Sequence, residues 1–158
     1  MTHQETQKIK EEIYEFFKQT GLELEVEVGD ISDSTIPVVL KTEEPQFLIG
    51  ERGQTLIETQ RLLKAILRRK VILTSPFYID IDVNDYKKKK IEYLKEMART
   101  AADEVILTKE EKELPSMSSY DRRIIHTTLA SRTDIATEST GQEPERKIVI
   151  KMPLKKEF

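Results

Sequence analysis

The sequence contains no cysteine among its 158 residues. It can therefore form no disulfide and offers no thiolate as a nucleophile or metal ligand. It has no apolar run near the ~18 residues that a membrane-spanning helix needs. Its first residues also lack the basic-then-apolar layout of a secretory signal. From these absences we predict a cytoplasmic protein without a membrane span.

Glycine and histidine are both scarce, with 5 glycines and 2 histidines in the chain. One of the histidines, His3, stands close to the N-terminus. We find no cluster of metal-ligand residues, no Walker-type nucleotide loop and no credible catalytic triad. We therefore predict that the protein is not an enzyme and uses no cofactor and no metal.

The net charge of −3 conceals an uneven distribution. Residues 1–49 contain 11 acidic and 4 basic side chains, whereas residues 50–70 contain 6 basic and 2 acidic ones. Residues 145–158 contain 5 basic and 2 acidic side chains. A nucleic-acid-binding protein needs a positive face rather than a positive total charge. The distribution fits such a protein, although many protein surfaces share it.

Hydrophobic periodicity predicts a helix, two strands, a short helix, a longer helix and a third strand in the first half of the chain. Apolar residues recur at helical spacing as far as Gly21, which ends the first helix. The Leu-Glu-Leu-Glu-Val-Glu-Val run that follows alternates as a half-buried strand does. The predicted elements cover residues 6–20, 22–28, 36–40, 45–49, 54–69 and 78–83.

The second half of the chain is also predicted to mix helices and strands. We expect two helices, at residues 85–107 and 118–132, and three strands, at residues 111–115, 135–139 and 147–152. The predicted fold class is therefore α+β. We divide the chain into a first domain at residues 1–84 and a second at 85–158, which starts with a long connecting helix.

The segment Gly50-Glu51-Arg52-Gly53 joins the short helix to the longer one. A side chain at either glycine would hold a sugar-phosphate chain away from the backbone. The helix that follows offers free N–H groups and the positive end of its dipole to a phosphate. Arg52 would attract the phosphate chain and Glu51 would repel it. We therefore expect a weaker clamp than one with two cations.

The helix after this loop has a basic side. Arg61, Lys64 and Arg68 lie within about 60° of one another around its axis. Such a stripe is usually a helix face exposed to solvent. Beside a glycine loop it can also bind successive phosphates of a nucleic-acid strand, so both interpretations stay open. Ile57, on the same side, is either an isolated surface residue or an apolar wall for an unstacked base. The residues expected to pack on the sheet are Leu56, Leu62, Leu63, Ile66 and Leu67.

Arg122 and His126 form the second candidate site. Ser118 is a predicted N-cap, and Asp121 three residues later gives a capping-box pattern. The spacing of four puts Arg122 and His126 on one helix face. There the arginine offers a planar donor fork to phosphate, and the histidine offers a donor or, when protonated, a charge. From spacing alone, a histidine hydrogen-bonded within its own domain is the simpler interpretation.

Three separated segments, at residues 48–56, 117–126 and 137–150, resemble the bacterial Jag (KhpB) family. Members of this family join a KH domain to an Arg-x-x-x-His domain, here called the R-three-H domain. The resemblance implies a type II KH domain (αββααβ) with Gly50 to Gly53 as its clamp. It also implies a small α+β R-three-H domain with a three-stranded sheet, in which Arg122 and His126 are the characteristic pair. The closing loop of that domain would contain Thr137, Ser139 and Arg146.

We predict binding of single-stranded nucleic acid without catalysis, with RNA favoured and DNA left open. The resemblance implies an RNA chaperone or regulator linked to cell elongation and wall homeostasis, often partnered by a small stand-alone KH protein. The alternative is a protein-interaction adaptor whose clamp binds RNA weakly or not at all, which Glu51 and the acidic first 49 residues favour. The predicted nucleic-acid-binding residues are Gly50, Glu51, Arg52, Gly53, Ile57, Arg61, Lys64, Arg68, Arg122, His126, Arg146 and Lys147.

Overall fold

The computed structural model describes residues 2–72 and 75–154. The chain forms two compact units, Met1–Lys87 and Lys88–Phe158. Each unit has a hydrophobic core of its own. No helix in the described ranges is both long enough and apolar enough to cross a membrane.

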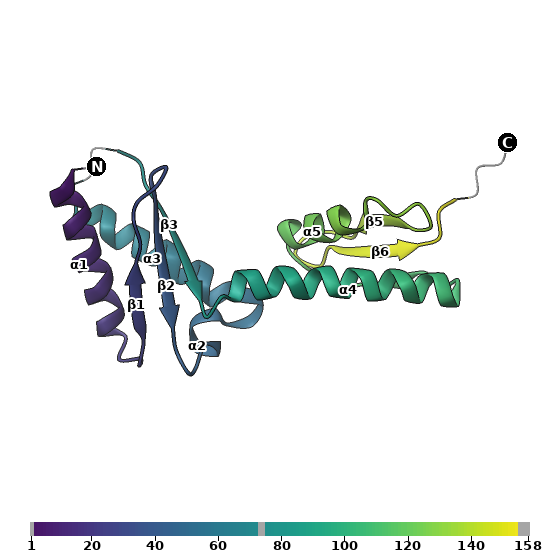
Figure 1. The fold of residues 1–158 in the computed structure, drawn as a ribbon, viewed down its shortest axis with the longest axis horizontal. Coiled ribbons are helices and arrows are strands. Elements are labelled where there is room, and N and C mark those ends of the chain that lie inside the picture. Colours follow the sequence, from purple (N-terminus) through teal and green to yellow (C-terminus); the bar gives the residue numbers. More distant parts are fainter. Residues whose placement is uncertain (1, 73–74, 155–158) are drawn as a thin grey trace. The chain divides into compact units, whose positions relative to one another are not determined.

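The described residues of the first unit form three helices and three strands in the order predicted from the sequence, with a short 3-10 turn between the second and third helices. Strand β2 is central in the sheet and pairs antiparallel with β1 and parallel with β3. The elements are α1 (His3–Gln19), β1 (Glu25–Val28), β2 (Thr35–Lys41), α2 (Gln46–Ile49), η1 (Glu51–Gly53), α3 (Gln54–Lys70) and β3 (Tyr78–Val83) (Figure 1).

The core of the first unit lies between one face of this sheet and helices α1 and α3. Alternate residues of β2 and β3 point into it, so that these strands bury every second side chain. Helices α1 and α3 each contribute residues at helical spacing. The fully buried members include Ile9, Ile13, Ile36, Leu40, Leu63, Leu67 and Ile81.

Two boundaries in the first unit differ from the predicted ones by more than one residue. Helix α1 begins at His3 rather than at residue 6, because Thr2 and Glu5 form a capping box. The Thr2 hydroxyl oxygen accepts from Glu5 N at 3.2 Å, and Thr2 N donates to Glu5 Oε2 at 2.6 Å. Strand β1 begins only at Glu25, where Lys41 of β2 first lies opposite it. Ladder pairing, and not the alternating pattern, therefore decides where this strand starts.

In the described residues of the second unit, two helices pack with a three-stranded antiparallel sheet. The three-stranded sheet expected for this half of the chain is thus confirmed. Helix α4 (Tyr86–Thr108) contributes a buried stripe that is mostly alanine. The other elements are β4 (Lys112–Glu113), α5 (Ser119–Leu129), β5 (Ala136–Thr140) and β6 (Lys147–Lys151), with β6 central in the sheet (Figure 1). The core includes Ala98, Ala102, Val105, Ile125, Ile148 and Ile150.

The predicted capping box at the start of α5 is only half formed. The Ser118 hydroxyl oxygen accepts a hydrogen bond from Asp121 N at 3.2 Å, as an N-cap does. The Asp121 carboxylate does not return to Ser118 but pairs with Lys90 Nζ of α4 at 2.9 Å. A buried carboxylate needs a partner, and the lysine on the neighbouring helix provides one. The capping-box prediction was therefore wrong for the Asp121 side chain.

Candidate nucleic-acid interface

The glycine loop has a backbone that ordinary residues rarely adopt. Gly50 and Gly53 have φ values of 70° and 80°, and Arg52 between them has 54°. A Cβ added at Gly50 would lie 2.0 Å from Thr55 Oγ1 and 2.7 Å from Thr55 Cβ. Gly50 is therefore required by the chain itself, because both its dihedral angles and its neighbour exclude a side chain.

Gly53 is buried against Tyr86. A Cβ at this position would lie 3.1 Å from the Tyr86 hydroxyl oxygen and 3.3 Å from Cε1. From the sequence, the approach of a ligand was the only reason we gave for the two glycines. The structure adds an internal reason for each, and Tyr86, which supports the loop, was missed. No local sequence signal links a tyrosine to a loop more than thirty residues before it.

Glu51 and Arg52 form the tip of the loop, and both side chains are exposed. The tip therefore presents one negative and one positive group side by side. Helix α3 starts directly after the loop, with Gly53 at its N-cap position and no side-chain cap. The Gln54 N–H, the first amide of this helix, donates to the Glu51 carbonyl oxygen, so the loop backbone and not a side chain caps the start of α3.

The predicted basic side of α3 is divided by contacts with other side chains. Arg61 Nη1 pairs with Glu58 Oε1 at 2.9 Å. Lys64 Nζ lies 4.5 Å from the ring centre of Tyr78, a cation–π contact at the start of β3. Arg68 is exposed in the last turn, and Ile57 is 46% exposed near the loop. Arg61, Arg68 and Ile57 thus lie on an open surface as the prediction describes them, whereas Lys64 is half-buried against Tyr78.

Of the five residues predicted on the apolar side of α3, three are buried, Ile66 is half-buried and one is exposed. Leu56, Leu63 and Leu67 are buried in the core. Leu62, expected to pack on the sheet, is 54% exposed. The sheet has three strands and covers a narrow stripe of the helix, so a leucine at the margin of that stripe stays outside.

Arg122 is buried, with 7% of its surface exposed. Its Nη1 donates to the Met117 carbonyl oxygen at 2.6 Å, and its Nη2 donates to Glu143 Oε1 at the same distance. The guanidinium therefore joins the segment before α5 to the loop between β5 and β6. In this arrangement its donor fork is occupied by the protein, so Arg122 shapes the site from inside.

His126 is half-buried one turn further along α5. Its Nδ1 lies 2.7 Å from Thr137 Oγ1 of β5. Burial, and then the positive charge of Arg122, hold the pKa of His126 below its ordinary value of 6.5. Among the contacts of residues 2–72 and 75–154, none engages Nε2. The second ring nitrogen is therefore the atom that His126 can offer to a ligand.

Arg146 and Lys147 complete the predicted group on the hairpin formed by β5 and β6. Arg146 Nε donates to Ser139 Oγ at 2.9 Å, and its Nη1 donates to the Gly141 carbonyl oxygen at 2.8 Å. Lys147 pairs with Glu113 of β4. Arg122 and His126 of α5 thus contact the β5–β6 hairpin, and Arg146 contacts other residues of that hairpin.

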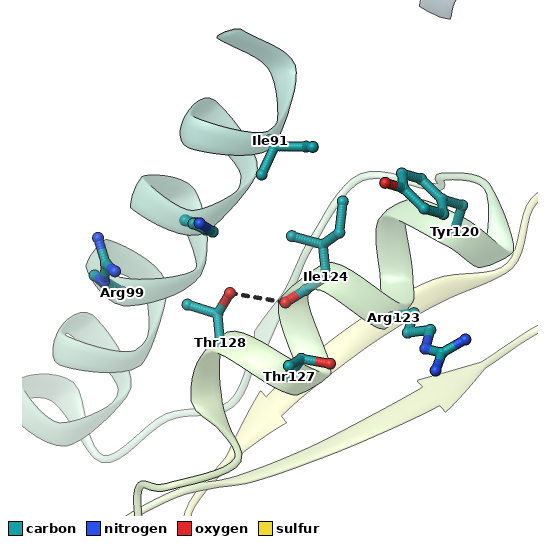
Figure 2. A pocket seen from close by; sticks show the side chains of 8 residues that line it. Ile91, Arg99, Tyr120, Arg123, Ile124, Thr127 and Thr128 are labelled. Carbon is teal, nitrogen blue, oxygen red and sulfur yellow. Dashed lines mark hydrogen bonds between the residues drawn. The ribbon is translucent and has the colours of Figure 1, made fainter. Parts of the chain in front are cut away.

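A groove between α4 and α5 was not predicted from the sequence. It has a volume of about 480 Å³. Figure 2 shows Ile91 of α4 and Ile124 of α5 facing the space between the two helices, with Tyr120 on α5 and Arg99 further along α4. The spacing of Ile91, Lys95 and Arg99 on one face of α4 is a signal that could have indicated it.

The described residues do not contain a metal centre: no group of three His, Asp or Glu side chains in residues 2–72 and 75–154 is placed to hold an ion. The described geometry instead consists of a strained glycine loop, a helix start without a side-chain cap, and a histidine of α5 held by a braced hairpin.

Comparison with known proteins assigns the second unit. The family model for the R3H domain matches residues 92–152. These residues are an R-three-H domain. The domain comprises most of α4, all of α5 and the three-stranded sheet, and it contains both Arg122 and His126.

Similarity to known proteins extends well beyond the R-three-H domain. The RNA-binding protein KhpB of Clostridium symbiosum is 31% identical over 152 residues, which cover 91% of this chain and 66% of that protein. The RNA-binding protein KhpB of Bacillus subtilis is 34% identical over 121 residues, or 75% of this chain and 57% of that protein. The protein of that name from Lactiplantibacillus plantarum is 29% identical over 133 residues, or 84% of this chain and 40% of that protein. The chain thus spans between about two fifths and just under two thirds of the length of these relatives.

The R-three-H domain together with these relatives supports the resemblance to the Jag/KhpB family that was noted from the sequence.

Proposed function

We propose that this chain binds single-stranded RNA and acts by binding alone, as a member of the Jag/KhpB family with a KH domain before its R-three-H domain. The relatives carry the name RNA-binding protein, and their similarity to this chain reaches into both units. The observation within the structure that carries the proposal is the start of α3, which has no side-chain cap.

Helix α3 differs in this respect from two other helices of the chain. Thr2 caps α1 and Ser118 caps α5, each through its side-chain oxygen. At α3 the N-cap is Gly53, which has no side chain, and the preceding backbone is held in place by two glycines with positive φ. Amide donors at a helix N-terminus are suited to a phosphate oxygen. Arg52, exposed at the loop tip, adds a positive charge for the same strand.

The R-three-H domain supplies a second contact in this proposal. His126 offers Nε2 to a phosphate, and its ring is held by Thr137. Arg122 and Arg146 then act as positioning residues, because their guanidinium groups brace the hairpin that holds Thr137. Two modules of modest affinity on one chain reinforce each other through effective concentration.

Fluorescence anisotropy with a random-sequence single-stranded RNA pool tests the proposal. We expect saturable binding whose log Kd rises with log salt by ~0.7 for each phosphate contact. A single-stranded DNA pool of equal length measures the preference for RNA. Saturation only by DNA, or an affinity that does not change with salt, would contradict the proposal.

A protein-interaction adaptor is the second candidate, and one observation favours it. Predicted cations already have carboxylate partners on other segments of the chain, as in Lys147–Glu113 and Arg122–Glu143. Fewer positive groups therefore remain for a nucleic acid than the sequence suggests. If the full chain binds no RNA even at low salt, the adaptor becomes the better description.

The proposal also includes three expectations that come from the resemblance to the Jag/KhpB family. They are a cytoplasmic location, a role as an RNA chaperone linked to cell elongation and wall homeostasis, and a small stand-alone KH protein as partner. Crosslinking in cells, followed by sequencing of the attached RNA and identification of copurified proteins, tests the role and the partner together. Fractionation of the same cells tests the location.

A further inference from the structure

We propose that the groove between α4 and α5 takes a base of the bound single strand, with Tyr120 as the stacking platform and Lys95 and Arg99 as contacts to the adjoining phosphates. The inference rests on the proposed RNA binding, and it adds a contact on the opposite side of α5 from His126. Positions 120, 124 and 128 follow one another at a spacing of four, whereas Arg122 and His126 lie about half a turn away.

The groove is open, and its lining combines apolar, aromatic and basic groups. Ile91 and Ile124 are half-buried and face the space between the helices (Figure 2). Tyr120 is 64% exposed, although a tyrosine ring is costly to leave in water. An exposed aromatic ring beside an apolar floor is the arrangement on which an unstacked base rests in single-strand-binding proteins.

The charges of the groove favour an anionic occupant. Its charged lining residues are Lys95, Arg99 and Arg123, all positive. Lys95 and Arg99 make ion pairs at 3.4 and 3.9 Å with Glu92 and Glu96, which do not line the groove. Exposed pairs of this kind on one helix contribute little stability and are easily exchanged for a phosphate. Arg123 extends away from α4 (Figure 2), so it is left out of the proposed contact.

The dimensions of the groove favour a nucleotide over an acidic helix of a partner protein. A volume of about 480 Å³ lies in the range of small-ligand sites. An amphipathic helix would need a longer row of apolar positions than Ile91 and Ile124 provide. We therefore assign the groove to a nucleotide of the strand, and an acidic peptide becomes an outcome of the test.

RNA anisotropy with matched pairs of variants of the full chain tests the groove. Tyr120→Ala should weaken binding of the random single-stranded RNA pool ~5-fold or more, whereas Tyr120→Phe, which keeps the ring, should bind as the parent does. Lys95→Gln should lower the salt slope by ~0.7, the share of one phosphate contact. Lys89→Gln is the matched control, because it makes the same change on an exposed position of α4 outside the groove. Thermal melts of all four variants should match that of the parent.

The outcomes separate this inference from the proposed function. If the parent binds RNA and Tyr120→Ala binds equally well, the groove inference is overturned and the proposed function stands. If the parent binds no RNA, both fail. If the groove variants keep RNA affinity but lose binding to a poly-glutamate peptide containing aromatic residues, the groove belongs to a protein partner and the inference is again overturned.

Discussion

Arg122 Nη2 and Glu143 Oε1 lie 2.6 Å apart, and this contact ties helix α5 to the loop that joins β5 and β6. The arginine end of the pair is buried, whereas the Glu143 side chain is 58% exposed. The same guanidinium also holds the Met117 carbonyl oxygen. The residue that the sequence suggests as a phosphate ligand is therefore a brace for its own domain.

Arg122→Ala should destabilise the protein by about 2–3 kcal/mol, because it leaves the Met117 carbonyl oxygen without its donor and opens a space beside α5. Glu143→Gln should cost less than about 1 kcal/mol, since the glutamate is largely in water. Urea unfolding measures both values. An Arg122→Ala protein with parental stability and lost RNA affinity would instead make the arginine a direct ligand.

His126 should make stability depend on pH. Its pKa is lowered in the folded protein, so the unfolded chain binds more protons as the pH falls below about 6.5. The free energy of unfolding should therefore fall as the pH decreases through that value. In a His3→Gln background, His126→Gln should reduce this loss between about pH 7.5 and about pH 5. Equal pH profiles with and without His126 would disprove the effect.

Gly50→Ala should destabilise the first unit by more than the ~1–2 kcal/mol cost of a left-handed residue, because Gly50 combines φ 70° with ψ −175°, which essentially only glycine adopts, and the new Cβ would also collide with Thr55. Gly21→Ala is the matched control: Gly21 also has a φ of 70°, but a Cβ there would have nothing within 4 Å. The two free energies of unfolding should therefore differ clearly. Equal values would mean that neither the extended backbone at Gly50 nor the contact with Thr55 adds a cost.

Glu51→Lys should tighten RNA binding, since it replaces a repelling carboxylate at the loop tip by a second cation. The salt slope should steepen by ~0.7, as expected for one added phosphate contact. Because Glu51 is exposed, stability should change by less than about 0.5 kcal/mol. Glu23→Lys, at an exposed position before β1, controls for the change in net charge. Equal effects of the two substitutions on RNA binding would show that the loop does not contact the RNA.

Most elements of the fold could be predicted from local patterns. The alternation in β2 and β3 and the helical spacing of Leu56, Leu63 and Leu67 are direct consequences of burying one face, so they are visible in one dimension. The start of α1 was missed because Thr2 and Glu5 form a capping box that the apolar pattern does not include. The extent of β1 was overestimated because pairing with β2 limits it.

The candidate site could be located from the sequence, but the partners of its residues could not. The glycine loop and the Arg122–His126 spacing are local patterns. Whether Arg122 faces a ligand or Glu143 depends on a contact across 21 positions, and the Thr137 partner of His126 is 11 positions away. The groove between α4 and α5 likewise requires two helices to pack, and neither helix alone forms it.

The sequence by itself determined the order of helices and strands, the position of the glycine turn and the face of α5 that holds Arg122 and His126, because each follows from the periodicity of a single segment. Only the tertiary structure decided which cations are already paired, that Tyr86 supports the loop beneath Gly53, and that Tyr120 stands exposed beside a groove. These features depend on tertiary contacts between side chains, and the spacing of residues along the chain does not determine such contacts.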